Sequence, residues 1–110
     1  MATSVPEICE LLKAVGYEKH NVRDDQHVTL LFETSKYADS QGRKALLIVI
    51  QLLEDGEYIR IMAPAVYKVA GPHTALVFRL FTMIQWRTKL MQFEYGESSG
   101  EINAVVEFPL

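Results

Sequence analysis

The chain has 110 residues and a mass of 12.5 kDa, which is the size of one small domain. Apolar residues make up 49% of the chain and charged residues 23%, proportions that exclude a disordered, collagen-like or low-complexity protein. The single cysteine, Cys9, excludes an internal disulfide framework and a cysteine-rich zinc site, and it fits a reducing compartment. The formal net charge of −3 creates no field that favours nucleic acid or an anionic membrane.

The first residues predict a helix rather than a targeting segment. Ser4 and Glu7 have the spacing of a capping box, in which each side chain satisfies a free amide of the other residue. One apolar helix face follows, formed by Ile8, Leu11, Leu12 and Val15, and Gly16 is suited to the helix end. No basic region precedes an apolar stretch, and no apolar run is long enough to span a bilayer. We therefore expect a cytoplasmic protein.

The middle of the chain predicts strands. Residues 17–26 are polar and without a period, whereas residues 27–34 favour a strand. Residues 44–53 are apolar on both faces, with Leu46, Ile48 and Ile50 on one of them, so we expect this strand to be covered on both sides. An Asp55-Gly56 turn leads into a return strand over residues 58–69, which Pro64 ends or bends.

A second helix is predicted from Gly71-Pro72 to about Lys89. Its most apolar arc, which we expect to face the core, contains Leu76, Val77, Leu80, Phe81, Met83 and Ile84. Two aromatic residues fall on the opposite side, in a stripe of Phe78, Thr82 and Trp86 flanked by Ala75, Arg79 and Gln85. Large aromatics on a nominally wet face need a cover, either from this chain or from a partner, and we favour the partner.

A second hairpin completes the chain, with strands over residues 90–95 and 101–108. The predicted order is α-β-β-β-α-β-β. Strands joined by short turns indicate an α+β domain, residues 1–110, with an antiparallel five-stranded sheet and helices on one side.

No sequence motif for catalysis, metal binding or cofactor binding has the context that its chemistry requires. Gly96-Glu97-Ser98-Ser99-Gly100 has the letters of a nucleophile elbow, but a strand rather than a helix is expected after it. His20, His27 and His73 lack metal-ligand spacing. The carboxylate groups Asp24-Asp25, Glu54-Asp55-Glu57 and Glu94-Glu97-Glu101 fall in turns or loops, where charge is readily solvated. Arg60, Tyr58 and Tyr67 on one strand are a weak match to an RNA-stacking sheet.

The order of elements resembles the YbjN family and the related type III secretion chaperone-like fold. The matching segments are Ile8–Leu12 with Gly16-Tyr17, Glu54–Ile59, Phe93–Tyr95, Gly100–Ile102 and Glu107–Leu110. The resemblance implies a small, acidic, non-enzymatic and often dimeric protein, and the secretion chaperones hold extended segments of clients. Domains of this kind usually continue with another helix, so we expect either a short version of the domain or one that lacks this helix.

These observations lead to the hypothesis of a chaperone-like adaptor that forms a homodimer, holds a segment of a client protein, and uses no cofactor, metal, nucleic acid or membrane. We expect the subunit contact at Phe78, Thr82, Trp86, Ala75 and Gln85, and the client surface at Leu46, Ile48 and Ile50. The client could add as a strand to an open sheet edge. The alternatives are a regulatory domain with an apolar ligand cavity, or a small hydrolase using Asp55 or Glu97.

Overall fold

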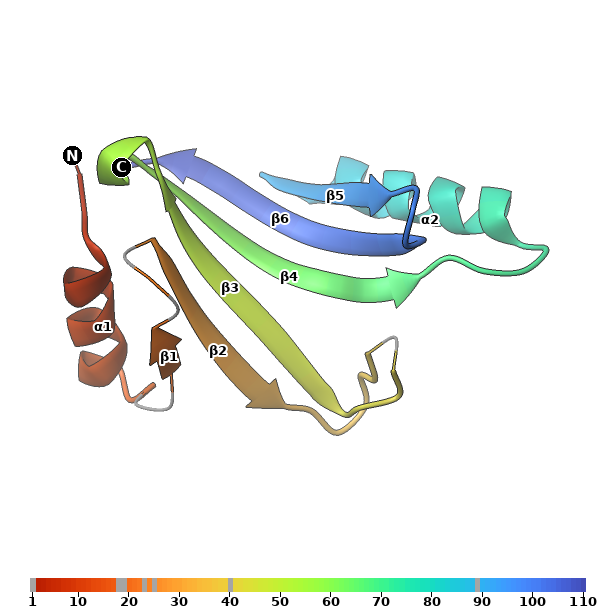
Figure 1. Ribbon diagram of the computed structural model, residues 1–110. Helices are drawn as coiled ribbons and strands as arrows, with labels where there is room; N and C mark the ends of the chain where they lie inside the picture. The colour runs from red at the N-terminus through yellow and green to blue at the C-terminus, as the bar shows by residue number, and fades with distance from the viewer. Residues whose placement is uncertain (1, 18–19, 23, 25, 40, 89) are drawn as a thin grey trace.

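The computed structural model describes residues 2–17, 20–22, 24, 26–39, 41–88 and 90–110, and in them an antiparallel sheet carries two helices (Figure 1). The elements are α1 (Val5–Ala14), β1 (His20–Val22), β2 (His27–Glu33), β3 (Ala45–Leu53), the 3-10 turn η1 (Glu54–Gly56), β4 (Tyr58–Lys68), α2 (Thr74–Arg87), β5 (Met91–Gly96) and β6 (Glu101–Pro109). The α+β class and the antiparallel sheet are as predicted.

The sheet has six strands in the order β1-β2-β3-β4-β6-β5, so the prediction of five strands was wrong. The additional strand is β1, which pairs with β2 from His20↔Leu30 to Val22↔Val28. A three-residue polar edge strand has no periodicity to reveal it, and its pairing depends on the neighbouring strand rather than on its own side chains. The second helix begins at Thr74, three residues later than expected; its predicted end at Lys89 lies outside the described residues.

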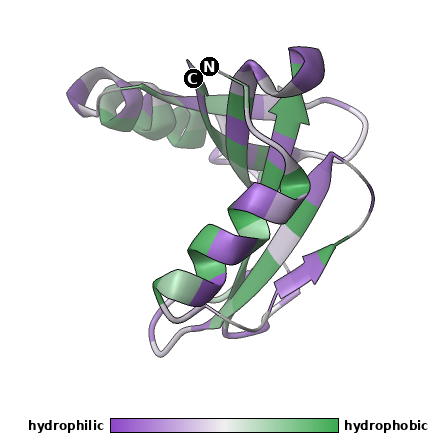
Figure 2. Ribbon diagram, turned by 90° about the vertical axis from the view of Figure 1, so that its left-hand side faces the viewer, coloured by the Kyte–Doolittle hydropathy of each residue, from purple (hydrophilic) through white to green (hydrophobic). Residues whose placement is uncertain are grey.

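Helix α1 forms where the capping pattern places it. The Ser4 hydroxyl accepts a hydrogen bond from the Glu7 amide at 3.4 Å, while the Glu7 carboxylate accepts one from the Thr3 hydroxyl. The helix buries Val5 and Ile8 against β2 and β3, in a core completed by Val28, Leu30, Ile50 and Leu52. Figure 2 shows hydrophobic stretches of the strands behind α1. This cluster is the main core of the molecule.

Both helices lie on the same face of the sheet, at opposite ends. Paired residues of a sheet share a face. Ile50, which lies in the core beneath α1, pairs with Ile61, and Ile61 pairs with Val106. The β6 residues Val106 and Ile102 therefore lie on the same face as α1. Tyr95, the β5 partner of Ile102, lies beneath α2. Neither of the two described helices lies on the other face of the sheet, which we call the helix-free face.

Helix α2 is rotated relative to the prediction: Phe81 of the predicted core arc does face the sheet, but so does Phe78, which was expected to face outward. Phe81 packs against Phe93 of β5 with ring centroids 4.7 Å apart, and Phe78 packs edge-on against Tyr95 at 4.8 Å. The predicted core residues Leu76, Leu80 and Met83 face outward, and none of the α2 residues is fully buried. Aromatic rings of β4 and β5 pack against Phe78 and Phe81 of the helix. The hydrophobic arc of the helix alone could not predict these contacts.

Candidate functional site

Among the described helices and strands, α2 has the most exposed large apolar side chains, and they lie on its outer face. Exposed fractions are 64% for Leu76, 55% for Leu80, 53% for Met83 and 86% for Trp86. Because a large side chain presents about 150–250 Å² when fully open, these four expose on the order of 500 Å². The largest apolar patch on a typical monomer measures about 300–600 Å², so the area exposed here lies in the upper part of that range. We call Leu76, Leu80, Met83 and Trp86 the α2 patch.

The subunit contact expected from the sequence divides between two sides of α2. Trp86, Thr82 and Ala75 are exposed. Phe78 packs on Tyr95, and the Gln85 side-chain oxygen accepts a hydrogen bond from the Phe93 amide at 2.8 Å. Phe78 and Gln85 therefore contact this chain's own sheet, and their contact with a partner stays a prediction. Leu76, Leu80 and Met83 take their place on the outer surface.

The residues of the expected client surface do not form an open surface together. Ile50 is buried, and Ile48 packs against the cluster beneath α1, so neither forms an open surface. Leu46 is half-buried at the rim of a small pocket. The other side of β3 is the open one, because Leu47 and Val49 line the helix-free face. The strand is apolar on both faces as predicted, but α1 covers only one of them.

Strands β3 and β4 pair only partway and then diverge (Figure 1). Their ladder runs from Leu53↔Tyr58 to Val49↔Met62, and the next hydrogen-bonded pair in this register would be Leu47 with Pro64. Proline has no amide hydrogen, so it cannot donate to the Leu47 carbonyl. β4 then bulges at Ala65, whose φ is +52°, and resumes pairing with β6 at Tyr67. The prediction that Pro64 ends or bends the strand is confirmed as a bend.

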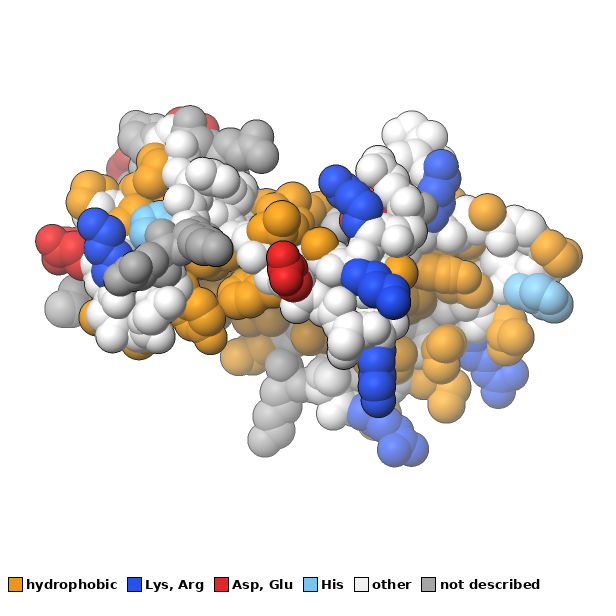
Figure 3. All heavy atoms as spheres, turned by 90° about the horizontal axis from the view of Figure 1, so that it is seen from below, with side chains coloured by type: hydrophobic (Ala, Val, Ile, Leu, Met, Phe, Trp, Pro, Cys, Tyr) orange, Lys and Arg blue, Asp and Glu red, His pale blue; other side chains and the backbone are white. Residues whose placement is uncertain are grey.

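An apolar groove of about 410 Å³ lies on the helix-free face where the two strands diverge. Its lining consists of Asp24, His27, Thr29, Leu47, Val49, Met62 and Pro64. A smaller pocket of about 130 Å³ adjoins it at Leu47 and Pro64. Figure 3 shows the molecule from below, with apolar side chains between the left-hand part, which contains α1, and a group of basic side chains. The groove is of the size that binds small ligands or a few side chains of a partner.

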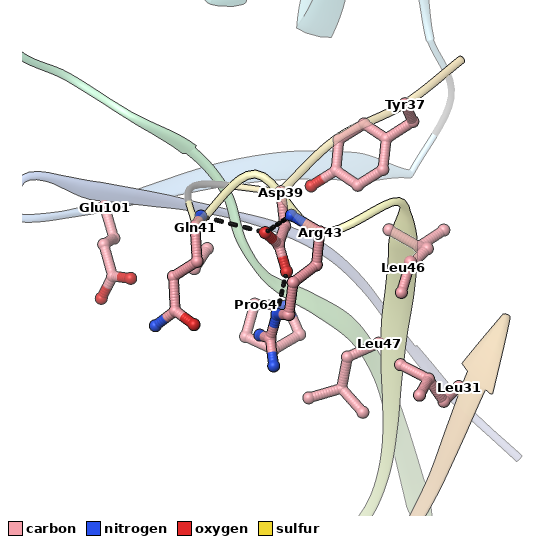
Figure 4. A pocket seen from close by; sticks show the side chains of 11 residues that line it. Leu31, Tyr37, Asp39, Gln41, Arg43, Leu46, Leu47, Pro64 and Glu101 are labelled. Carbon is pink, nitrogen blue, oxygen red and sulfur yellow. Dashed lines mark hydrogen bonds and ion pairs between the residues drawn. The ribbon is translucent and has the colours of Figure 1, made fainter. Parts of the chain in front are cut away.

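The loop between β2 and β3 is fixed over the smaller pocket. The Asp39 carboxylate accepts hydrogen bonds from the Gln41 amide, the Arg43 amide and the Arg43 Nε, all within 2.9 Å (Figure 4). These donors, the Arg43 amide foremost, hold the pKa of Asp39 below its ordinary value. The Tyr37 hydroxyl donates to the Val66 carbonyl at 3.1 Å. The loop is therefore anchored to β4 across the opening.

Charged groups on the helix-free face form ion pairs, although the Arg60 Nε is buried without a hydrogen-bond partner among the described residues. Arg60 donates to Glu94 at 2.5 Å and lies 3.5 Å from Glu107. At the other end, His27 Nδ1 lies 2.9 Å from Asp24, and this hydrogen bond lowers the pKa of the Asp24 carboxyl. Of these pairs, Asp24 and His27 line the apolar groove.

The candidates for chemistry lie far apart. Asp55 lies in η1, at the start of β4, whereas Glu97 lies in the β5–β6 turn, near the end of β4. Within the described ranges no three His, Cys, Asp or Glu side chains are grouped as a metal site. His20 contacts the Tyr17 carbonyl, and His73 precedes α2. Asp25 of the Asp24-Asp25 pair lies outside the described residues. Gly96 to Gly100 forms a hairpin turn between two strands, as predicted.

No family model, curated protein or solved structure matches the chain. Among the described residues, neither helix has the length and apolar character needed to cross a membrane. The apolar groove on the helix-free face and the α2 patch are therefore the surface features that bear on the function.

Proposed function

We propose that the protein is a non-enzymatic binding domain of the chaperone-like adaptor kind, which forms a homodimer through the α2 patch and holds a segment of a client protein. The observation that carries the proposal is the α2 patch itself. Burial of apolar surface is the main favourable term in protein association, so a helix that leaves Leu76, Leu80 and Met83 in water has that gain still available.

A two-fold symmetric contact suits this helix. The α2 patch is a stripe along one helix, and two antiparallel copies of such a stripe can cover each other. The patch offers on the order of 500 Å² per subunit, and neighbouring side chains can extend this toward the roughly 800 Å² per partner of a standard interface. Ile84, a further α2 side chain that is 38% exposed, is a candidate for that extension.

The test compares the two helices. Leu80→Glu combined with Met83→Glu places two charges in the α2 patch and is expected to shift the protein from dimer to monomer in sedimentation velocity at micromolar concentrations. The matched control is Leu11→Glu with Val15→Glu, because these residues are equally exposed near or on α1 and lie outside the proposed contact. The control is expected to remain a dimer. A wild-type protein that sediments as a monomer at about 100 μM, far above a micromolar Kd, contradicts the homodimer.

A further inference from the structure

We propose that a pocket between α2 and β5, walled by aromatic rings, binds a quaternary ammonium group such as a trimethylammonium. The pocket has a volume of about 190 Å³, and the rings of Phe78, Phe81, Phe93 and Tyr95 line it. It lies on the side of α2 that faces the edge strand β5 (Figure 1), so it is separate from the α2 patch. The site goes beyond the proposed function and does not depend on the dimer.

Two pairs of aromatic rings form the walls of the pocket. Phe78 stands at 80° to Tyr95 with ring centroids 4.8 Å apart, and Phe81 stands at 71° to Phe93 at 4.7 Å. Rings at nearly right angles form adjoining walls, whereas parallel rings would stack and close the space between them. The face of an aromatic ring is electronegative and attracts a cation, and several rings around one space are the usual site for a quaternary ammonium ion.

The hydrogen-bond donors beside the rings are used within the chain. The Phe93 amide donates to the Gln85 side-chain oxygen at 2.8 Å, and the Thr82 hydroxyl donates to the Phe78 carbonyl at 2.9 Å. Neither donor is therefore directed at an anion in the pocket. A quaternary ammonium group has no hydrogen to donate, so it requires ring faces rather than hydrogen-bond acceptors.

The charges around the pocket favour a cation. Glu94 is in the lining, and none of the described Lys or Arg residues is. The Glu94 carboxylate is paired with Arg60, but Arg60 also lies 3.5 Å from Glu107, so one positive and two negative groups leave a net charge of −1. The α2 residues Arg79 and Arg87 are exposed and lie outside the lining. A cation that enters the pocket is therefore attracted by the rings and by the nearest net charge.

The pocket lies at the surface, and its size suits a small group. Tyr95 is 44% exposed, and the other three rings are half-buried. The volume of about 190 Å³ is below the roughly 300–1,000 Å³ of pockets that enclose a drug-sized ligand. The occupant is therefore a headgroup or the end of a long side chain rather than a larger molecule.

The test titrates the full chain with choline and follows the Phe93 amide and the Gln85 side-chain amide by two-dimensional NMR, at an ionic strength held constant with NaCl. The matched probe is dimethylbutanol, in which a tert-butyl group replaces the trimethylammonium group, so the shape is kept and the charge is removed. Choline is expected to bind with a dissociation constant of about 10 mM or below, and at least about fivefold more tightly than dimethylbutanol. Equal binding of the two probes, or no shift of the Phe93 amide at about 50 mM choline, overturns the inference.

Three variants test the role of the rings. Tyr95→Leu removes one ring and is expected to weaken choline binding about fivefold, whereas Tyr95→Phe keeps the ring and is expected to retain binding. Trp86→Leu is the matched control, because Trp86 is an aromatic residue of α2 that is 86% exposed on the outer face. Unchanged binding in Tyr95→Leu, or an equal loss in Trp86→Leu, overturns the inference. The comparison of choline with dimethylbutanol uses the wild-type protein, so it is decisive even if Tyr95→Leu does not fold.

The ammonium group has two possible sources, a free small molecule and a methylated lysine side chain of a protein. A short peptide with a central trimethyllysine distinguishes them, with the same peptide carrying unmodified lysine as its control. Tighter binding of the trimethyllysine peptide than of choline assigns the site to a protein side chain, and tighter binding of choline assigns it to a small molecule. Equal binding of the methylated and unmethylated peptides overturns the inference, because it shows that the methyl groups do not enter the pocket.

Discussion

Gly56 shows how one residue connects the turn between β3 and β4 to the amino terminus. Its φ is +87°, and a Cβ atom at this position would lie 2.1 Å from the Thr3 carbonyl oxygen. The Thr3 amide donates to the Gly56 carbonyl at 2.9 Å, so the two backbones approach closely and without a side chain between them. Only glycine satisfies both the conformation and the approach.

Gly56→Ala is therefore expected to lower the free energy of unfolding by about 2 kcal/mol or more, because it adds a steric clash to the cost of a positive φ. Gly42→Ala is the matched control. Gly42 has a φ of +81°, but a Cβ atom added there would meet no other atom within 4 Å, so it should show the backbone cost alone, about 1 kcal/mol. Urea denaturation measures both. Equal losses for the two variants would mean that the Thr3 contact contributes nothing.

The sequence predicts half of this arrangement. An Asp-Gly pair favours two successive left-handed residues, and Asp55 and Gly56 have φ values of +55° and +87°. The approach of Thr3 could not be predicted, since it joins residues more than fifty positions apart in the chain. Local conformational preference follows from neighbouring residues, whereas a close backbone approach depends on the finished packing.

At the scale of elements, Pro64 decides where the sheet opens. Pro64→Val restores an amide that can donate to the Leu47 carbonyl, so β3 and β4 are expected to pair one step further. The free energy of unfolding should rise by about 1 kcal/mol, the value of one hydrogen bond, and the amide at position 64 should exchange slowly.

Pro109→Val is the control for this prediction. Pro109 is in β6 opposite Tyr58, and the hydrogen-bonded pairs of this ladder alternate from Ile59↔Phe108, so no strand uses the amide that this change creates. Its effect on unfolding should stay within a few tenths of a kcal/mol. A Pro64 variant that is no more stable than this control would show that the opening has another cause.

The elements themselves were largely readable from the sequence, but their orientation was not. Alternation, a continuous apolar run for β3 and the intervening turns placed β2, β3, β4 and the β5–β6 hairpin within a residue or two of their observed bounds. Helix α2 is apolar on two sides, and periodicity identifies both sides without saying which of them meets the sheet. The choice is made by Tyr67, Phe93 and Tyr95 on distant strands, which pack with Phe81 and Phe78. The same ambiguity applies to β3, where the sequence did not show that Ile48 and Ile50 lie on the covered side and Leu47 and Val49 on the open one.

At the scale of the whole molecule, the chain is extended for its length. Its radius of gyration is 15.4 Å, compared with about 13 Å for a compact domain of this size. Its accessible surface is 8043 Å², whereas a folded monomer of this mass averages about 6,200 Å². The two helices cover separate ends of one sheet face, and the helix-free face contributes further surface (Figure 1). The excess accessible surface therefore follows from the extended arrangement of the elements.

The charges beside the α2 patch allow the proposed dimer to be distinguished from other contacts. Helix α2 contains Arg79 and Arg87 and no acidic residue, so an antiparallel α2–α2 contact brings like charges together. Screening is expected to relieve this repulsion, and the dimer dissociation constant should fall as NaCl rises from about 20 to 300 mM. Arg79→Gln with Arg87→Gln should tighten the dimer at low salt and remove most of the salt dependence. Analytical ultracentrifugation at both salt concentrations measures this.

A dimer that weakens with salt would indicate that α2 meets an acidic surface, such as the Glu7 and Glu10 side of α1, and would contradict the two-fold α2 contact.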